Sequence, residues 1–371
     1  MLAGGTGAQA SFSAFTIGLP VLAPALRSHY GLSLTQVGVV LGAGWVGTTV
    51  TLLPWGLLAD RLGERLVLVL GLTGCAAVLV AVAFAPGFAA LVTLLAAAGA
   101  AGASVNSASG RAVMQWFAAD ERGLALGIRQ TAIPLGGVTT AVVLPHLGLE
   151  TAFLFLAALT LGGAVAGGAL IRERVVEGVE PEAVPWTLRD GRLWWLSFGT
   201  GLYLVAQIAI TGFVVLFLHD DRGLSDVAAG VVLAGVQVLA VATRIGAGRW
   251  SDALGTRIVP LLRIGLASFA TVALVALAVS APLLVLVPAF VLAGGLAMAW
   301  NGLSLTAAAE LAGEARSGAA IGFQQTALSM IGVATPIAFA AAVDATSWRA
   351  AFALAALFPL AGVFALRRLR I

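Results

Sequence analysis

Few side chains in this sequence could do chemistry, and the most informative are arginines within long apolar segments. Arg129 lies in the stretch GIRQTAIPLGG, and Arg244 lies at a similar depth in a later apolar segment. A guanidinium group binds a carboxylate or similar oxyanion through two parallel hydrogen bonds, so this pair favours an anionic ligand. The alternative is structural, because either arginine could instead bond backbone carbonyls, Glu310 or Asp252. Arg111 is a third, shallower candidate that could also pair with loop charges.

Uncharged polar side chains in the same segments form a second group of candidate ligand contacts. Each could serve equally well as a hydrogen bond between helices. An indole among them could stack on a planar ligand or simply pack. The candidates are Asn106, Gln130, Gln207, Asn301, Gln324 and Gln325, with Trp300 as the indole.

Several kinds of chemical site are missing from the sequence. It has no phosphate-binding glycine loop, no histidine and cysteine cluster with metal-ligand spacing, and no Ser/His/Asp or paired-carboxylate arrangement. We therefore expect no ATP, metal or cofactor, and no enzyme activity. No acid lies deep in the first or fourth apolar segment, where a proton carrier is expected. Glu310, at a shallow position, is the best candidate proton site, which leaves the coupling ion open.

The composition indicates a membrane protein. Of 371 residues, 60% are hydrophobic and only 10% are charged, whereas a soluble domain carries about 25% charged residues. A soluble enzyme, a nucleic-acid-binding protein and a disordered chain are thereby disfavoured. The net charge of +3 comes with 20 basic residues that are all arginine and lie mainly at segment ends. Such arginines set membrane topology, so we expect no nucleic acid as a partner.

Twelve apolar segments are long enough to cross a bilayer, which takes about 20 residues. They predict an all-α membrane protein. A signal peptide would have a basic residue before its apolar core, and the first segment has none, so we expect it to be a membrane helix. The segments fall at 4–26, 35–56, 66–86, 88–114, 123–145, 150–171, 193–217, 227–248, 258–280, 282–309, 317–341 and 346–366.

A single long polar stretch divides the chain. Residues 172–192 are rich in arginine, glutamate and proline, which predicts a linker between two six-helix bundles at 1–171 and 193–371. With twelve spans, one set of alternate loops holds most arginines, and the other holds only Arg27, Arg222 and Arg349. The positive-inside rule then places the linker and both termini in the cytoplasm.

The two halves repeat each other. At an offset of 192, GLLADRLGER at 56–65 aligns with GRWSDALGTR at 248–257, and Gly31-Leu32-Ser33 aligns with Gly223-Leu224-Ser225. At an offset of 195, Asn106 aligns with Asn301, and Gly127, Gln130, Thr131 and Ala132 align with Gly322, Gln325, Thr326 and Ala327. Transporters are commonly built from such repeats, with the substrate bound between the halves near the middle of the bilayer.

The first copy, GLLADRLGER, resembles the loop signature of the major facilitator superfamily between helices two and three. It departs at Glu64, where the family has a basic residue, and the second copy departs at Ala253. The resemblance implies a six-plus-six bundle that works by alternating access in a bacterial inner membrane, and we expect a monomer. The implied gating residues are Gly56, Asp60, Arg61, Gly63, Arg65, Gly248, Asp252, Gly255 and Arg257.

The resemblance also assigns the two motif carboxylates a role. Asp60 is expected to face the start of the eleventh helix near Ser317, and Asp252 the start of the fifth helix near Gly123, when the cytoplasmic side is closed. Free backbone N–H groups and the helix dipole favour an anion at such a position. Gly56 and Gly63 are expected to permit a close helix approach and a tight turn.

These features predict a secondary transporter of a small organic or inorganic anion in the lipid bilayer, with protons as one candidate coupling ion. GIRQTAIPLGG and its arginine look similar to bacterial cyanate-type and organic-acid carriers. A proton-coupled exporter of drug-like amphiphiles is the alternative, since Pro134-Leu135-Gly136-Gly137 partly matches an antiporter motif. A non-transporting membrane sensor and a membrane-embedded enzyme are disfavoured by the short linker and the lack of catalytic groups.

Overall fold

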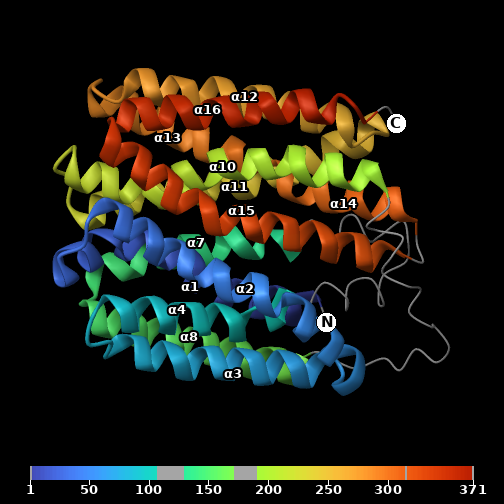
Figure 1. Ribbon diagram of the computed structural model, residues 1–371, viewed down its shortest axis with the longest axis horizontal. Helices are drawn as coiled ribbons and strands as arrows, with labels where there is room; N and C mark the ends of the chain where they lie inside the picture. The colour runs from blue at the N-terminus through green and yellow to red at the C-terminus, as the bar shows by residue number, and fades with distance from the viewer. Residues whose placement is uncertain (1, 107–128, 171–189, 314–315, 370–371) are drawn as a thin grey trace.

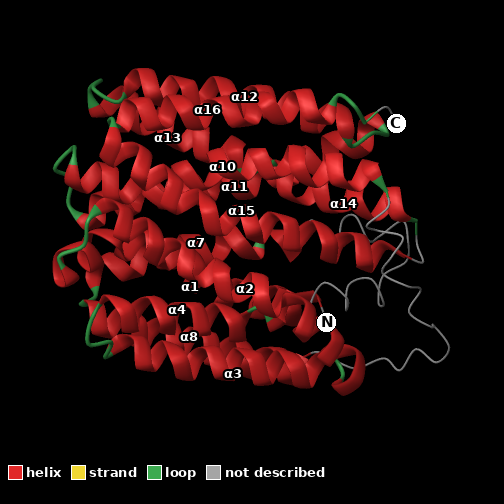
Figure 2. Cartoon of the chain, viewed as in Figure 1, coloured by secondary structure: helices red, strands yellow, loops and turns green. Residues whose placement is uncertain are grey.

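The structure is a computed structural model of the 371-residue chain, and it describes residues 2–106, 129–170, 190–313 and 316–369. These residues form helices joined by short turns, with no strand among them (Figure 2). The elements are α1 (Leu2–Tyr30), α2 (Leu34–Leu62), α3 (Glu64–Ala83), α4 (Phe88–Gly102), α7 (Ala132–Val143), η1 (Leu144–His146), α8 (Leu149–Leu170), α10 (Gly191–Asp220), α11 (Asp226–Leu254), α12 (Ile258–Ala278), α13 (Leu283–Ala297), α14 (Trp300–Ala312), α15 (Ser317–Ala345) and α16 (Trp348–Leu366).

The predicted all-helical membrane fold is confirmed. Within the described residues, 11 helical segments are long and apolar enough to cross a membrane, and α13 and α14 together make one of them. The shorter apolar segment Ala132–His146 lies where the fifth span is predicted. The remainder of that span and the end of the fourth fall outside the described residues.

The helices lie in two groups (Figure 1). The described helices from α1 to α8 form the N-terminal group, and those from α10 to α16 form the C-terminal group. Three seams join the groups, namely α2 with α15, α7 with α11 and α1 with α10. We call the end of the bundle with the N and C labels in Figure 1 the terminal end, and the other end the opposite end. The domain boundaries stay a prediction, because most of the linker is not described.

The repeat reappears in the turns that begin and end the helices. Gly31 and Gly223 have φ of 62° and 67°, values that suit glycine because it has no Cβ. Ser33 and Ser225 follow as the N-caps of α2 and α11, and each side chain accepts a backbone N–H of the new helix. The same Gly-Leu-Ser sequence therefore builds the same turn in both halves.

The α2–α15 seam is a backbone contact near the opposite end. A Cβ at Gly38 would lie 2.5 Å from the carbonyl oxygen of Pro336, and one at Gly42 would lie 3.0 Å from that of Val333. Small residues let membrane helices approach this closely, and van der Waals packing then holds them together.

Two helices are interrupted at matching points of the repeat. The helix that contains α4 has a turn at Ala103, and α13 is separated from α14 by a turn at Met298–Ala299. These positions align at the offset of 195. An interrupted membrane helix exposes backbone groups that need other partners. In this fold the partners include an arginine at the seam between the two groups.

Candidate substrate site

Three residues of α11, spaced seven apart, contact α7 or the residues just before it. Gly230 approaches the carbonyl oxygen of Ala141, and Gln237 packs against Gly137. Arg244, two helical turns further, donates from Nη1 to the carbonyl oxygen of a residue just before α7. Seven residues make about two turns, so these side chains lie on one face of the helix.

Arg244 is held by two backbone carbonyls. It is 7% exposed, and its Nη1 donates to the oxygen of Gln130. Its Nε donates to the oxygen of Met298 at 3.0 Å. Gln130 belongs to the N-terminal group of helices and Met298 to the C-terminal group, so Arg244 bridges the two.

Both carbonyls are available because the helices around them are irregular. A regular helix would use the oxygen of Gln130 to accept an N–H from position 134, but Pro134 has none. The oxygen of Met298 lies at the break between α13 and α14, and it also accepts Nδ2 of Asn301 at 3.1 Å. The site is therefore built from carbonyls that lack their usual donors.

The positive charge of Arg244 is not balanced within the part of the chain that the structure describes. None of the ion pairs there involves Arg244. Its Nη2 is buried and has no hydrogen-bond partner among the same residues. A buried donor left unpaired costs about 1–3 kcal/mol, and more when it is charged. An anion next to Nη2 would offset this cost.

Arg129 approaches the same region from the N-terminal group. It is 4% exposed, and its Nη2 donates to Oε1 of Gln9 at 3.1 Å and to the carbonyl oxygen of Asn106 at 3.4 Å. Arg129 directly precedes Gln130, whose carbonyl holds Arg244. Arg244 therefore binds the backbone next to Arg129, the other arginine predicted from the sequence.

Three further sequence candidates, Asn301, Gln207 and Gln324, form hydrogen bonds within the C-terminal group of helices. Asn301 donates to Oε1 of Gln207 at 3.0 Å, close to the helix break. Gln324 is fully buried within the C-terminal group, where it donates to Ser304 and, at 3.4 Å, to Thr200.

The remaining sequence candidates are Trp300, Gln325 and Arg111. Trp300 is 1% exposed and packs edge-on against Tyr203, with ring centroids 6.4 Å apart. Gln325 is half-buried on α15, and its carbonyl accepts the hydroxyl of Ser329. Arg111 lies outside the described residues.

Sequence reasoning missed two buried glutamines. Gln9 on α1 accepts from Arg129, and Gln237 on α11 is fully buried with neither amide atom hydrogen-bonded among the described residues. A Cβ on Gly137 would lie 2.7 Å from Cδ of Gln237, so only glycine fits opposite it. Both glutamines fall in predicted spans, so the rule that polar groups within a membrane are functional candidates could have found them.

The repeated loop motif is partly described at the terminal end. Gly63 and Gly255 have φ of 83° and 61°, as a tight turn requires. A Cβ added at Gly56 or Gly248 would have no described atom within 4 Å. Among the described residues, no helix therefore approaches Gly56 closely in this conformation. Arg61 and Arg65 are exposed.

Asp252 and Glu310 both bind one arginine. Asp252 pairs with Nη1 of Arg257, and Oε1 of Glu310 lies 3.0 Å from its Nε. Burial acts to lower the pKa of Arg257, but the hydrogen bonds to Asp252 and Glu310 outweigh it and raise the pKa above its usual value. Glu310 is thus engaged at the protein surface. The partner expected for Asp252 near Gly123, and the side chain of Asp60, are outside what the structure describes.

Comparison with known proteins identifies the family. The family model described as Major Facilitator Superfamily matches residues 6–336. The chain belongs to the major facilitator superfamily. It is 33% identical over 364 residues to the uncharacterized MFS-type transporter Rv2994 of Mycobacterium tuberculosis, which covers 96% of this chain and 82% of that protein. It is therefore a multi-pass membrane transporter and not an enzyme.

Partial relatives in the superfamily carry substrate names. The hexuronate transporter of Bacillus subtilis is 22% identical over 224 residues, covering 56% of this chain and 53% of that protein. The probable sulfoacetate transporter of Cupriavidus necator is 33% identical over 152 residues, covering 39% of this chain and 35% of that protein.

Solved structures of the superfamily share the whole fold. A bacterial homologue of the human lysosomal transporter Spinster, in an inward-facing and occupied conformation, gives a TM-score of 0.77 at 16% identity, covering 99% of this chain and 94% of that one. The human organic anion transporter MFSD10 gives 0.75 at 20% identity, covering 98% and 97%. At these identities the likeness establishes the fold alone.

Proposed function

We propose that this superfamily member transports a small organic anion by alternating access, and that Arg244 and Arg129 bind the anionic group. The observation that carries the proposal is the buried Nη2 of Arg244, which has no hydrogen-bond partner among the described residues. The two carbonyls at Nη1 and Nε orient the guanidinium without neutralising it. Its charge is therefore available to a carboxylate or sulfonate, which binds such a group through charge-assisted hydrogen bonds.

The names of the partial relatives support an anion. Hexuronate and sulfoacetate both carry an acidic group at neutral pH, and the two transporters named for them match this chain in part. The location of the arginine supports it as well, because a charged side chain within a membrane segment usually marks a substrate or ion pathway. We further propose that the terminal end faces the cytoplasm of a bacterium, as the arginine-rich loops predict.

A ligand-stabilisation screen of the purified protein tests the substrate class. Hexuronates, sulfoacetate and simple dicarboxylates are compared with neutral sugars of the same size and with cationic dyes. We expect a rise in Tm with at least one anion and none with its neutral analogue, because a ligand that binds only the folded state stabilises it. Stabilisation by the dyes alone would reject the anion and favour an exporter of amphiphiles.

Variants of the two arginines then test the site with the anion found. Arg244→Lys keeps the charge but loses the planar guanidinium, and Arg244→Gln loses both. We expect Kd to rise about 10- to 100-fold in Arg244→Gln, as for the loss of one charge-assisted hydrogen bond. Arg129→Gln is expected to act in the same direction. The matched control is Arg263→Gln, since Arg263 is exposed on α12 beside Trp250.

The same variants separate binding from structure. If Arg244 is only structural, Arg244→Gln lowers Tm and leaves Kd unchanged. That outcome would remove the anion site from this position, whatever the substrate. A rise in Kd with little change in Tm supports the proposal.

A further inference from the structure

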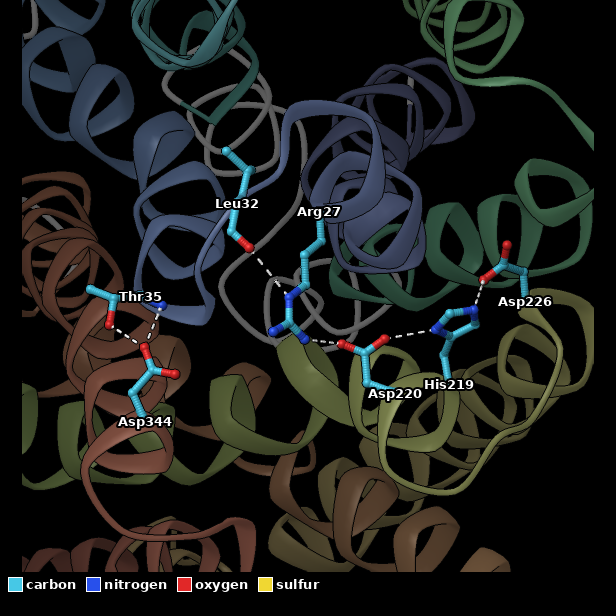
Figure 3. A network of polar contacts seen from close by, with 7 residues as sticks. All are labelled: Arg27, Leu32, Thr35, His219, Asp220, Asp226 and Asp344. Carbon is cyan, nitrogen blue, oxygen red and sulfur yellow. Dashed lines mark hydrogen bonds and ion pairs between the residues drawn. The ribbon is translucent and has the colours of Figure 1, made fainter.

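An ion pair joins the two groups of helices at the opposite end. Nη1 of Arg27, near the end of α1, contacts Oδ2 of Asp220, the last residue of α10 (Figure 3). Nε of Arg27 also donates to the carbonyl oxygen of Leu32 at 3.3 Å, which fixes the arginine against its own turn. The pair therefore links a cation of the N-terminal group to a carboxylate of the C-terminal group.

A second carboxylate links the two groups of helices at the α2–α15 seam. Oδ2 of Asp344, near the end of α15, accepts the backbone N–H of Thr35 at 3.0 Å and its hydroxyl at 2.7 Å. Thr35 lies in the first turn of α2. At this end, both links therefore run from an aspartate of the C-terminal group to a donor of the N-terminal group (Figure 3).

A histidine contacts the aspartate of the Arg27–Asp220 ion pair. Nδ1 of His219 is 2.7 Å from Oδ1 of Asp220, and its Nε2 is 3.7 Å from Oδ1 of Asp226. The imidazole therefore lies between two carboxylates, as Figure 3 shows. The same Oδ1 of Asp226 is buried and has no hydrogen-bond partner among the described residues. The side chain of His219 is 40% exposed, so solvent protons can reach it.

The other charged groups at this end have separate contacts. Among the described residues, none of them forms an ion pair with His219, Asp220 or Asp226. Arg222 donates to the carbonyl oxygens of Val279 and Ala281, each at 2.8 Å, and Arg349 donates to Ser280. Asp344 binds Thr35. The ring of His29 packs on that of Tyr30, and Asp221, His146 and Glu150 are exposed.

We propose that His219 is a proton-binding site whose occupancy opposes the Arg27–Asp220 contact. With a neutral imidazole, the positive charge of Arg27 faces the two negative charges of Asp220 and Asp226. With a protonated imidazole, one of these charges is cancelled and the attraction for Arg27 falls. The proton therefore favours separation of the two groups at the opposite end.

Linkage makes the effect reciprocal. If a proton on His219 weakens the docking of Arg27, then the docking of Arg27 must weaken proton binding by the same factor. Histidine changes charge between about pH 5 and 8, so the compartment that faces the opposite end can set the occupancy. The site rests on alternating access, as in the proposed function, but on no particular substrate.

Spin-label distances without substrate test the conformational half of the proposal. After Cys75→Ser, labels at Ser28→Cys and Val227→Cys report the separation of α1 and α11 at the opposite end, since both positions are exposed. Between about pH 8 and about pH 5, we expect the long-distance population to grow at least twofold. His219→Gln is expected to keep the short distance at both pH values. A pH response that persists in His219→Gln would overturn the proposal.

Histidine NMR tests the proton site itself. The sequence has only three histidines, so His219 can be assigned by comparison with His219→Gln. At about pH 6.5, Arg27→Gln is expected to raise the protonated fraction of His219, and Asp226→Asn to lower it. Arg349→Gln removes a cation at the same end and is the matched control. If Arg27→Gln and Asp226→Asn both leave the fraction unchanged, the proposal fails, whether or not an anion is transported.

Discussion

The proposed anion site depends on a single missing backbone N–H as much as on any charged side chain. Pro134 has no N–H for the carbonyl of Gln130, and Arg244 takes that oxygen instead. A carboxylate in the same place would neutralise the arginine. A carbonyl carries only a partial charge, so the guanidinium is positioned while its net charge remains.

Replacing the proline tests this reasoning. In Pro134→Ala the new N–H can donate to the oxygen of Gln130 and compete with Arg244. We expect the Kd for the anion to rise about threefold to tenfold, as for a hydrogen bond worth about 1 kcal/mol, while Tm stays constant or rises. Both are measured by ligand titration and thermal unfolding.

The control for this prediction is Pro288→Ala, because Pro288 also lies inside a helix, α13, but is exposed. This change is expected to alter Tm alone. An unchanged Kd in Pro134→Ala would show that the carbonyl of Gln130 does not set the affinity.

At this scale the sequence identifies the buried polar residues better than it predicts their contacts. Arg129, Arg244 and Asn301 were predicted as candidates because polar groups in apolar segments are rare, and the structure places each of them near a helix irregularity. The burial of Trp300 against Tyr203 could not be predicted. It depends on which side of α14 meets α10, and a nearly uniform apolar segment does not encode that choice.

At the scale of helices, local turn chemistry was readable and helix breaks were not. The turns at Gly31 and Gly223 follow from glycine and a serine N-cap within three residues. The break at Met298–Ala299 has no glycine or proline at that point. Its free carbonyl at Met298 accepts a donor from Arg244 on α11 and one from the nearby Asn301, which stabilise the break.

The close α2–α15 seam predicts a sharp effect of one methyl group. In Gly38→Ala the added carbon would lie 2.5 Å from the carbonyl oxygen of Pro336, so the helices must separate. We expect Tm to fall by several degrees, as for about 1–3 kcal/mol of overpacking. Gly162→Ala, on α8 with open space around it, is the control and should leave Tm unchanged or raise it. Equal Tm values for the two variants would contradict the seam contact.

The loop motif yields a prediction about gating. Asp60→Asn removes the carboxylate that the family resemblance assigns to the start of α15, where a helix N-terminus favours an anion. We expect uptake to fall at least tenfold, while expression and substrate Kd change little. Asp221→Asn, an exposed carboxylate at the opposite end, serves as the control. Normal uptake in Asp60→Asn would remove the gating role.

At the scale of the whole molecule, the arginines predict the orientation of the protein in the membrane. After Cys75→Ser, we expect Glu180→Cys in the linker to resist a membrane-impermeant thiol reagent in intact cells. Ser28→Cys at the opposite end should react. Labelling at position 180 from outside would reverse the predicted orientation and exchange the compartments that the two ends face.

The overall architecture was largely predictable, because a bilayer allows few solutions. Apolar segments of sufficient length must become helices, since every backbone group has to be satisfied within the segment. The halves and their repeat followed from residues that recur at fixed offsets. The seams could not be predicted in the same way, because contacts such as Gly38 with Pro336 depend on sequence-distant backbones meeting at one depth.

The contacts that α11 makes with α7 and the residues before it, at three positions spaced seven residues apart, have a mechanical consequence. If the groups tilt about Gln237 as a fulcrum, the 17 residues to Leu254 form a lever arm of about 25 Å, and the 11 residues to Asp226 one of about 16 Å. A tilt of about 10° would then move the two tips by about 4 Å and 3 Å. Displacements of that size break a hydrogen bond at either tip, whereas groups near the fulcrum barely move. Arg244 lies seven residues, or about 10 Å, from Gln237 and would move by about 2 Å, less than either tip, so an anion bound there can keep its contacts while access passes from one face of the membrane to the other.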